Sequence, residues 1–362
     1  MADSANKFDI AEIIQKINYD SIPEAINQVF QTTSLGEIDA AIGNSFYGIN
    51  HRQTPAATPI NKDFHGLTFF TRPHFNLTTE NLNNSRQLTP LLTTKEESVQ
   101  RAIRNMLDRE LVKKGIRCPF IDNQQAFLPL LTNNLTSMSG WPDLKADTYV
   151  APDGAYKQTW MMVDSVAQDY SAYDITADFR NMPGSPIILL FFAWIHYMSL
   201  IYQGILVPYF EHIIENEIDY QTRIYRLVLD VTKTKVQAIS ACGAAIPSSA
   251  PMGALFNFSA ESPINNAFDT ISVNFRAVGA MYEDPLLIHE FNRTVQLFND
   301  TMRNQYRSSM YKLVDIEFLS IFNNRGYPRI NPETRDLEWW VPNDIYNQKM
   351  AIYLDQLKRR TK

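Results

Sequence analysis

The stretches YDITADF (residues 173–179) and TISVNFRAV (270–278) both alternate apolar and polar residues. An alternation with a period of two places the apolar side chains on one face of a β-strand. Ile271, Val273 and Phe275 therefore predict a strand with one buried face. Strand composition also predicts further strands at residues 67–72, 159–163, 221–230, 236–242 and 251–259. The chain is thus expected to be built around a β domain.

One long apolar segment, residues 187–207, lies between two of these strands. His196, Ser199 and Gln203 fall on one semi-polar stripe of a helix, and the other faces are apolar. This pattern favours a helix packed on a sheet, with one edge exposed to solvent or placed at a subunit contact. The segment is long enough to cross a bilayer, but acidic residues, rather than a Lys or Arg anchor, follow it. We therefore favour a packed helix, with Trp194 as a core or interface anchor.

The chain before the β domain has a different character. Isoleucines recur at helical spacing over residues 10–30, which predicts a helix. Residues 36–63 are rich in Ala, Gly, Asn, Thr and Pro, a composition typical of an extended arm. Residues 1–63 are therefore expected to form an N-terminal helical segment and arm.

The β domain is expected to span residues 64–285, with an insertion at about 76–150. Within the insertion, Thr94 and Glu97 have the spacing of a capping box, which predicts a helix from Thr94 to Lys114. The rest of the insertion, residues 116–150, reads as irregular.

Residues 286–362 are expected to form a C-terminal helical and hairpin extension. A helical pattern covers 285–308, a turn is expected at Asn331-Pro332, and a last helix is expected from Asn343. Trp339 and Trp340 are adjacent, so on an extended segment their side chains point to opposite faces. The sequence leaves open whether one of them docks a partner or is merely exposed.

Composition and charge restrict the function. Of the 362 residues 45% are hydrophobic and 20% charged, which is ordinary for a soluble protein. The 12% of aromatic residues suits β structure, large protein contacts or simply a large aromatic core. A net charge of −6 argues against a protein that wraps DNA by neutralising phosphates. It does not exclude a channel through which DNA slides.

The search for chemical sites is mostly negative. Cys118 and Cys242 are far apart and lack metal-ligand spacing, so reduced thiols in a cytoplasm are expected, and no secretory signal opens the chain. Cys242 lies among small apolar residues, which favours an inert packed thiol, and Gly243 after it is expected at a bend or close backbone contact. No nucleotide, metalloprotease or hydrolase motif is present.

Two sets of titratable residues could form sites, but neither pattern favours one. None of the six histidines pairs with another at i, i+3 or i+4. Asp164, Asp169, Asp174 and Asp178 are read as solvated carboxylates rather than as a catalytic group. We therefore predict no catalytic residue, no cofactor and no metal ligand.

The order of motifs resembles the tail-tube fold, which tube, tube-initiator and tube-cap proteins of contractile-tailed phages share. The matching stretches are GLTFFTRP (66–73), ITADF (175–179), AWI (193–195), IYRLVL (224–229), VQAI (236–239), CGAAIPSS (242–249) and DTISVNF (269–275). The match from residue 173 to 283 covers about a third of the chain. The segments outside it make the chain larger than a simple tube subunit.

This resemblance implies an α+β fold: a tail-tube-like antiparallel β-sandwich or barrel with a packed helix, plus helical N- and C-terminal extensions. It implies a virion structural protein of a phage tail, assembled in the bacterial host cytoplasm, and no enzyme. Such a protein forms a ring, expected to be a hexamer, that initiates, caps or continues the tail tube. Its expected partners are further copies of itself, other tail or baseplate proteins and the double-stranded DNA that passes without specific binding, and no membrane.

Three rival functions stay open: a neck or tail-terminator protein, a virion-associated hydrolase and a membrane-inserting protein that uses residues 187–207. For the ring, we expect Trp194, Trp339, Trp340 and Arg72 to be among the contacts between subunits.

Overall fold

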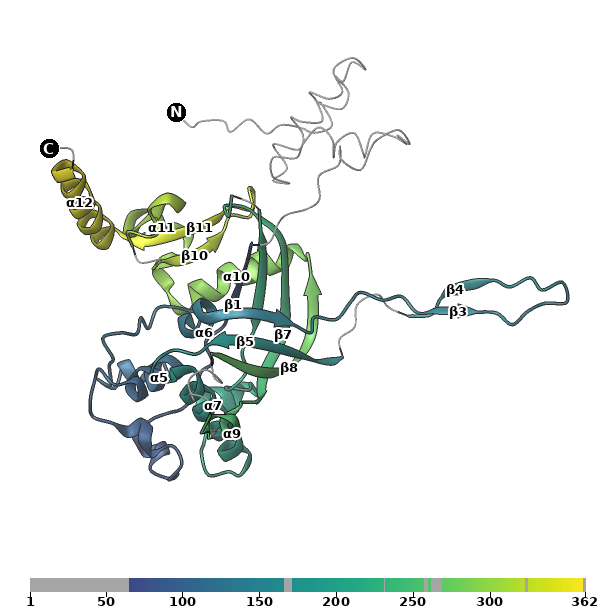
Figure 1. Cartoon of the computed structure of the whole chain (residues 1–362), viewed down its shortest axis with the longest axis horizontal. Coiled ribbons are helices and arrows are strands. Elements are labelled where there is room, and N and C mark those ends of the chain that lie inside the picture. Colours follow the sequence, from purple (N-terminus) through teal and green to yellow (C-terminus); the bar gives the residue numbers. More distant parts are fainter. Residues whose placement is uncertain are drawn as a thin grey trace, which may run out of the picture. The chain divides into compact units, whose positions relative to one another are not determined.

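The computed structural model of the chain describes residues 65–165, 171–230, 232–256, 260–261, 269–322 and 325–360 (Figure 1). The helix expected at 10–30 and the arm expected at 36–63 lie outside these residues. The described chain divides into two compact units that interleave along the sequence. The larger unit consists of residues 67–226 and 239–312, and the smaller draws its described residues mainly from 227–238 and 313–360.

The described chain contains both strands and helices. The strands are β1 (His65–Phe70), β2 (Leu135–Ser139), β3 (Thr148–Val150), β4 (Met161–Val163), β5 (Ala172–Arg180), β6 (Ile224–Leu229), β7 (Val236–Ser249), β8 (Thr270–Tyr282), β9 (Tyr311–Val314), β10 (Tyr327–Ile330) and β11 (Leu337–Pro342). The α-helices are α4 (Thr79–Leu82), α5 (Val99–Leu107), α6 (Pro129–Asn134), α7 (Pro186–Tyr202), α8 (Phe210–Glu215), α9 (Met252–Leu255), α10 (Pro285–Phe298), α11 (Asn304–Met310) and α12 (Asn343–Arg360).

A six-stranded sheet, ordered β1-β6-β7-β8-β5-β2, carries the fold. Strands β7, β8, β5 and β2 pair antiparallel and the sheet curls, which confirms an α+β fold with a tail-tube-like sheet of half-barrel shape (Figure 1). Strand β8 pairs with β5 in a register that sets Phe275 opposite Ile175 and Ile271 opposite Phe179. These four side chains are fully buried, so the face predicted from the alternation is confirmed.

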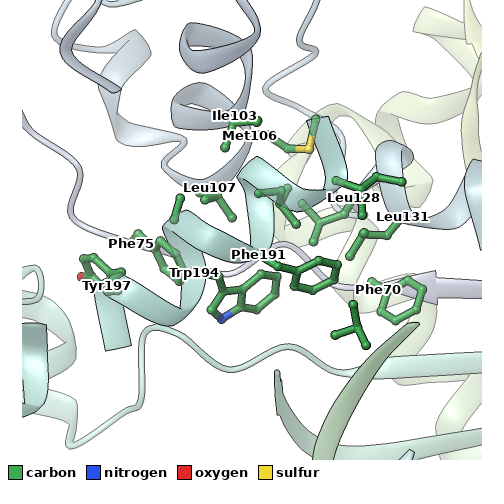
Figure 2. Close-up of a cluster of buried hydrophobic side chains, with 14 of the residues drawn as sticks. Phe70, Phe75, Ile103, Met106, Leu107, Leu128, Leu131, Phe191, Trp194 and Tyr197 are labelled. Atoms are coloured by element: carbon green, nitrogen blue, oxygen red, sulfur yellow. The ribbon is translucent and has the colours of Figure 1, made fainter. Parts of the chain in front are cut away.

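Helix α7 supplies the centre of the core, as the apolar segment predicted. It follows a turn in which Gly184 and Ser185 both have positive φ, and Pro186 occupies its first turn. Figure 2 shows Phe191 and Trp194 of α7 among aromatic and aliphatic side chains from distant segments. Eight residues of α7 are buried: Ile187, Ile188, Leu190, Phe191, Ala193, Trp194, Tyr197 and Leu200. A helix that is apolar on nearly all faces needs such cover on both sides.

The segment 76–150 forms part of this core, and two expectations for it were wrong. Helix α5 begins after Ser98, whose hydroxyl caps the amide of Arg101 at 3.2 Å, and not at Thr94. It ends at Leu107, because Asp108 leaves the helical conformation. Residues 116–150 are not irregular throughout, because they contain α6, β2 and β3.

A third local expectation was also wrong. Residues 252–255, which fall inside the strand expected at 251–259, form the short helix α9. The strand expected at 236–242 runs on to Ser249 as β7. Its extension pairs with β8, where Ala244 lies opposite Val278 and Ala245 opposite Ala277.

The smaller unit holds the predicted C-terminal hairpin and helix. Strands β10 and β11 pair antiparallel around residues 331–332, with Tyr327 opposite Trp340. They continue into a three-stranded sheet ordered β10-β11-β9. Helix α12 begins at Asn343, as expected, and its side chains Tyr346 and Met350 pack against a small buried cluster. That cluster consists of Val314, Phe322 and Val341.

Candidate assembly surfaces

At strands β2, β5 and β8, the side of the sheet that faces away from α7 is polar, whereas at β1 and β6 that side is apolar, with Phe69 and Tyr225 packed on Phe291 of α10. Phe191 of α7 packs against Phe179 and Phe275, so the alternate residues of β5 and β8 point to the other side. Strand β2 adds to that side at its pairing with β5. We call this surface the polar sheet face and define it by Ser137, Asp174, Thr176, Asp178, Arg180, Ser272, Asn274 and Arg276.

The residues of the polar sheet face bind one another across the strands. Asp174 pairs with Arg276 at 2.8 Å, and Thr176 donates to Asn274 Oδ1 at 2.9 Å. These pairs are direct cross-strand neighbours in the register of β5 and β8. Their hydrogen-bonding groups are therefore engaged within the sheet.

Asp178 is held by hydroxyl groups from both neighbouring strands. Ser137 of β2 and Ser272 of β8 donate to its carboxylate, and these hydrogen bonds lower the pKa of Asp178. With Arg180, which shares the period of Asp178, the face carries two carboxylates and two guanidinium groups. The described part of this face is thus hydrophilic without an excess of either charge.

A β-hairpin of strands β3 and β4 extends away from the sheet (Figure 1). Thr148 pairs with Val163 and Val150 with Met161, and the amide of Ala151 donates to the carbonyl of Trp160 at 2.8 Å. All six strand residues are exposed. The exposed apolar side chains of this hairpin arm are Leu144, Tyr149, Val150, Tyr156, Trp160, Met161, Met162 and Val163.

The root of the hairpin arm is fixed to the sheet. Trp141 packs beside Tyr173 of β5 and Tyr282 of β8, with ring centroids 6.4 and 6.2 Å away. Tyr282 also donates to the carbonyl oxygen of Pro142. Gly140 has φ +103°, and a Cβ there would lie 2.2 Å from the carbonyl oxygen of Asp174, so only glycine fits. The arm therefore leaves the sheet from a defined anchor.

Two histidines 138 positions apart meet near the end of α7. His74 Nδ1 lies 2.8 Å from His212 Nε2, so one ring donates to the other. Glu110 lies 4.0 Å from His74, and Glu217 lies 3.6 Å from His212. Burial, followed by the nearby Arg109 and His212, lowers the pKa of His74 to about 4. The spacing of the histidines in the sequence could not predict this pair, because the tertiary fold brings the two residues together.

We expect acid to weaken the fold through His74. An unfolded histidine titrates near 6.5, so between about pH 6.5 and 4 the unfolded chain binds a proton that the folded chain does not. Between pH 7 and 4.5 this lowers the free energy of unfolding by about 2 kcal/mol. His74→Gln should lack this loss, as measured by urea denaturation at both pH values.

Asp108 has the opposite effect on stability. Burial raises the pKa of Asp108 to about 6, so acid stabilises the folded chain through this carboxyl group. Its contribution is present in both the wild type and His74→Gln and cancels in their comparison. His289→Gln, at an exposed position of α10, is the matched control and should keep the wild-type pH dependence. Identical curves for His74→Gln and the wild type would contradict the assignment.

A family described as "Putative phage tail tube protein" matches residues 8–357. The chain belongs to this phage tail tube protein family. The resemblance that the sequence motifs carry is thereby confirmed, and the chain is a structural protein related to the phage tail tube.

Solved structures similar to this tail tube family member come from contractile systems. The tube-terminating cap of the anti-feeding prophage is 18% identical over 45% of this chain and 85% of that chain, with a TM-score of 0.27. The PVC sheath/tube terminator of an extracellular contractile injection system, in the extended state, is 15% identical over 44% and 88%, with a TM-score of 0.25. A chain of the PVC sheath–tube complex is 18% identical over 44% and 82%, with a TM-score of 0.27. No curated protein shows a significant match.

The structure places two of the four predicted subunit contacts inside the tail tube chain. Trp194 is fully buried and donates from Nε1 to the carbonyl of Tyr220 at 2.8 Å. Arg72 is buried and donates to the carbonyl oxygens of Met106, Asn105 and Asn123. Neither side chain is presented on the described surface.

The other two predicted contacts lie at the surface of β11. Trp339 and Trp340 are both half-buried, and Trp340 donates from Nε1 to Glu338 at 2.9 Å. Glu338 also pairs with Arg329 at 2.7 Å. Their role in contacts between subunits stays a prediction.

The cysteine and aspartate residues considered as chemical sites do not come together in the described structure. Cys242 is buried, and burial raises the pKa of its thiol to about 11. A Cβ on Gly243 would lie 3.2 Å from the carbonyl of Val278, which confirms the close backbone contact. Asp174 and Asp178 belong to the polar sheet face, and Asp169 lies outside the described residues. Within the described ranges, no group of three or more His, Cys, Asp or Glu side chains is arranged to hold a metal ion.

Helix α7 does not extend over the whole apolar segment 187–207. It ends at Tyr202, and Gly204 two residues later has a positive φ, which is incompatible with a continuing helix. Among the residues that the structure describes, no helix has both the length and the apolar character that crossing a membrane requires.

Proposed function

We propose that this protein is a ring-forming subunit of a phage tail that starts, caps or continues the tail tube around the DNA channel. The observation that carries the proposal is the hairpin arm, whose two strands expose apolar side chains along their whole length. An isolated two-stranded ribbon is only marginally stable in water. Its aromatic and methionine side chains suit the buried centre of a protein interface.

A neighbouring copy of the chain is the partner that fits this arm in our proposal. Trp160 and Met161 are 60% and 73% exposed, so docking would remove large apolar surfaces from water. If the arm of each copy binds the body of the next copy, head to tail, the contact is heterologous, and such contacts close into rings or continue as tubes. A hexamer is the ring size that we propose. Trp339 and Trp340 are proposed as further contacts.

The polar sheet face supports the placement of a channel. DNA binds surfaces that neutralise its phosphates, and a basic wall would hold it in place. The paired Asp174 and Arg276 and the equal numbers of carboxylates and guanidinium groups give a wall without a surplus of positive charge. In this proposal the protein acts by assembly rather than catalysis, in a virion tail assembled in the host cytoplasm.

Electron microscopy of the purified full-length protein, combined with its light-scattering mass, tests the proposal. We expect rings with a central hole whose mass is a fixed multiple of 41.6 kDa. Stacking on tail tube protein would favour a role in starting or continuing the tube, and binding at one end only would favour a cap. A chain that stays monomeric alone and with the other tail proteins would overturn the proposal.

A further inference from the structure

A second apolar surface lies where α7 ends and α8 begins, at residues 202–218. Its exposed apolar side chains are Tyr202, Ile205, Val207, Phe210, Ile213, Ile214 and Ile218. Tyr202 is 93% exposed and Phe210 is 72% exposed. Single exposed apolar residues are normal on a protein surface. These seven occur together within 17 residues, and a concentration of exposed apolar side chains is typical of a binding site. We call this surface the α7–α8 corner.

Buried polar contacts hold the α7–α8 corner in place. The hydroxyl of Tyr209 donates to Asp108 at 2.9 Å, and the ring of His212 lies 2.8 Å from that of His74. Asp219, at the far end of the corner, is buried and accepts from Tyr197. These contacts fix the backbone that carries the exposed apolar side chains. A partner that binds them therefore loses little conformational entropy of this segment.

The α7–α8 corner is acidic as well as apolar. Glu211, Glu215 and Glu217 are exposed in it. Residues 202–218 contain no Lys or Arg. A partner that covers the isoleucines must therefore bring positive charge beside apolar side chains.

Helix α12 of the same chain has this combination. Its first half is anchored, because Tyr346 stacks on Phe322 with ring centroids 5.4 Å apart. Tyr353 contacts Phe318, and other side chains of the helix are apolar and exposed. The exposed apolar residues of α12 are Ile345, Ile352 and Leu354.

The end of α12 supplies the positive charge. The chain ends KRRTK at residues 358–362, with four basic residues and no acidic residue after Asp355. Ile345 and Ile352 are seven residues apart and share one side of the helix, and Ile352 precedes this basic end by less than two turns. A helix of this type binds through its apolar side chains and is oriented by its charges.

We infer that α12 of one copy docks on the α7–α8 corner of a second copy of this chain. The exposed apolar side chains of α12 and of the corner would then cover each other, and the basic sequence at the end of α12 would meet the glutamates of the corner. The contact is heterologous, so an open row of copies has one free corner at one end and one free α12 at the other until the ring closes. The inference rests on the proposed ring and names one of its contacts.

Charge reversal tests the contact. Glu211→Lys with Glu215→Lys, and separately Lys358→Glu with Arg359→Glu and Arg360→Glu, should each weaken self-association about tenfold or more at low salt. Combining the two sets should restore most of the association. Sedimentation velocity over a concentration series gives the readout. Glu96→Lys with Glu97→Lys, at exposed positions elsewhere, is the matched control and should leave association unchanged.

Disulfide formation between two single variants tests the geometry. The native Cys118 and Cys242 are both buried. We expect a mixture of Phe210→Cys and Leu354→Cys chains to give a two-chain cross-link under mild oxidation. Leu286→Cys, at an exposed position of α10, replaces Phe210→Cys in the control mixture and should not cross-link with Leu354→Cys.

The outcomes separate this contact from the proposed function. Rings that persist in both charge-reversed variants, with no cross-link in the mixture, would overturn the contact and leave the ring intact. A one-chain cross-link in the Phe210→Cys/Leu354→Cys double variant, without a cross-link in the mixture, would show that α12 binds its own corner and would also overturn it. A wild type that stays monomeric both alone and with the other tail proteins would overturn both proposals.

Discussion

Replacing Trp194 with alanine is expected to lower the free energy of unfolding by about 3–5 kcal/mol. The indole is fully buried and contacts Phe75 at 5.7 Å and Phe191 at 6.3 Å between ring centroids. It lies between the sheet and the segment 76–150, so the cavity left by the truncation has no flexible neighbour to fill it (Figure 2). The midpoint of urea denaturation, followed by tryptophan fluorescence and circular dichroism, measures the loss.

Two variants control this prediction. Trp194→Phe keeps an aromatic ring but leaves the carbonyl of Tyr220 without the indole donor, so about 1–2 kcal/mol should be lost. Trp160→Ala makes the same truncation on the exposed hairpin arm and should change stability by less than about 0.5 kcal/mol. Equal losses for Trp194→Ala and Trp160→Ala would show that the core is not centred on α7.

Periodicity predicted the parts of this fold in which one side of an element is buried. Residues 173–179 and 270–278 alternate because β5 and β8 are covered on one face only. The apolar segment 187–207 identified α7, because a helix packed between a sheet and a second layer is apolar on most faces. In both cases the local order of apolar and polar residues matches the buried and exposed positions of the element.

The errors occur where distant contacts decide the local structure. Thr94 and Glu97 satisfy the capping-box pattern, but the residues between them and Ser98 are exposed. The helix begins where its apolar side chains Ile103 and Leu107 can reach the core. Packing therefore selected Ser98 as the cap over an equally good local signal.

The candidate surfaces were predictable only in part. Strand β2 has mostly exposed side chains, so its place at the sheet edge follows from pairing with β5 and not from alternation. The chain LTSMS (135–139) accordingly gave no strand signal. The pairing of β3 with β4 was missed for the same reason, because neither strand buries a face. A strand that buries no face within its own chain needs no alternation of apolar and polar residues, so its sequence does not predict it.

Replacing Trp160, Met161 and Met162 together with serine is expected to abolish ring formation while the chain stays folded. Each side chain is more than half exposed in the single chain, so its loss removes no core contact. In a docked arm the same side chains would be buried, and aromatic anchors of this kind contribute about 2–4 kcal/mol each at interface centres. Self-association should therefore weaken more than about a hundredfold. Analytical ultracentrifugation and electron microscopy measure the change.

The matched control places serine at exposed apolar positions outside the hairpin arm, with Leu286→Ser and Leu297→Ser on α10. These variants remove a comparable kind of surface and should still form rings. Wild-type association in the triple serine variant would show that the arm does not contact a neighbouring copy. A triple variant that unfolds would show instead that the arm is part of the folding unit, because three serines on a free ribbon should not change the urea midpoint. A folded monomer is the only result that assigns these exposed side chains to the contact between copies.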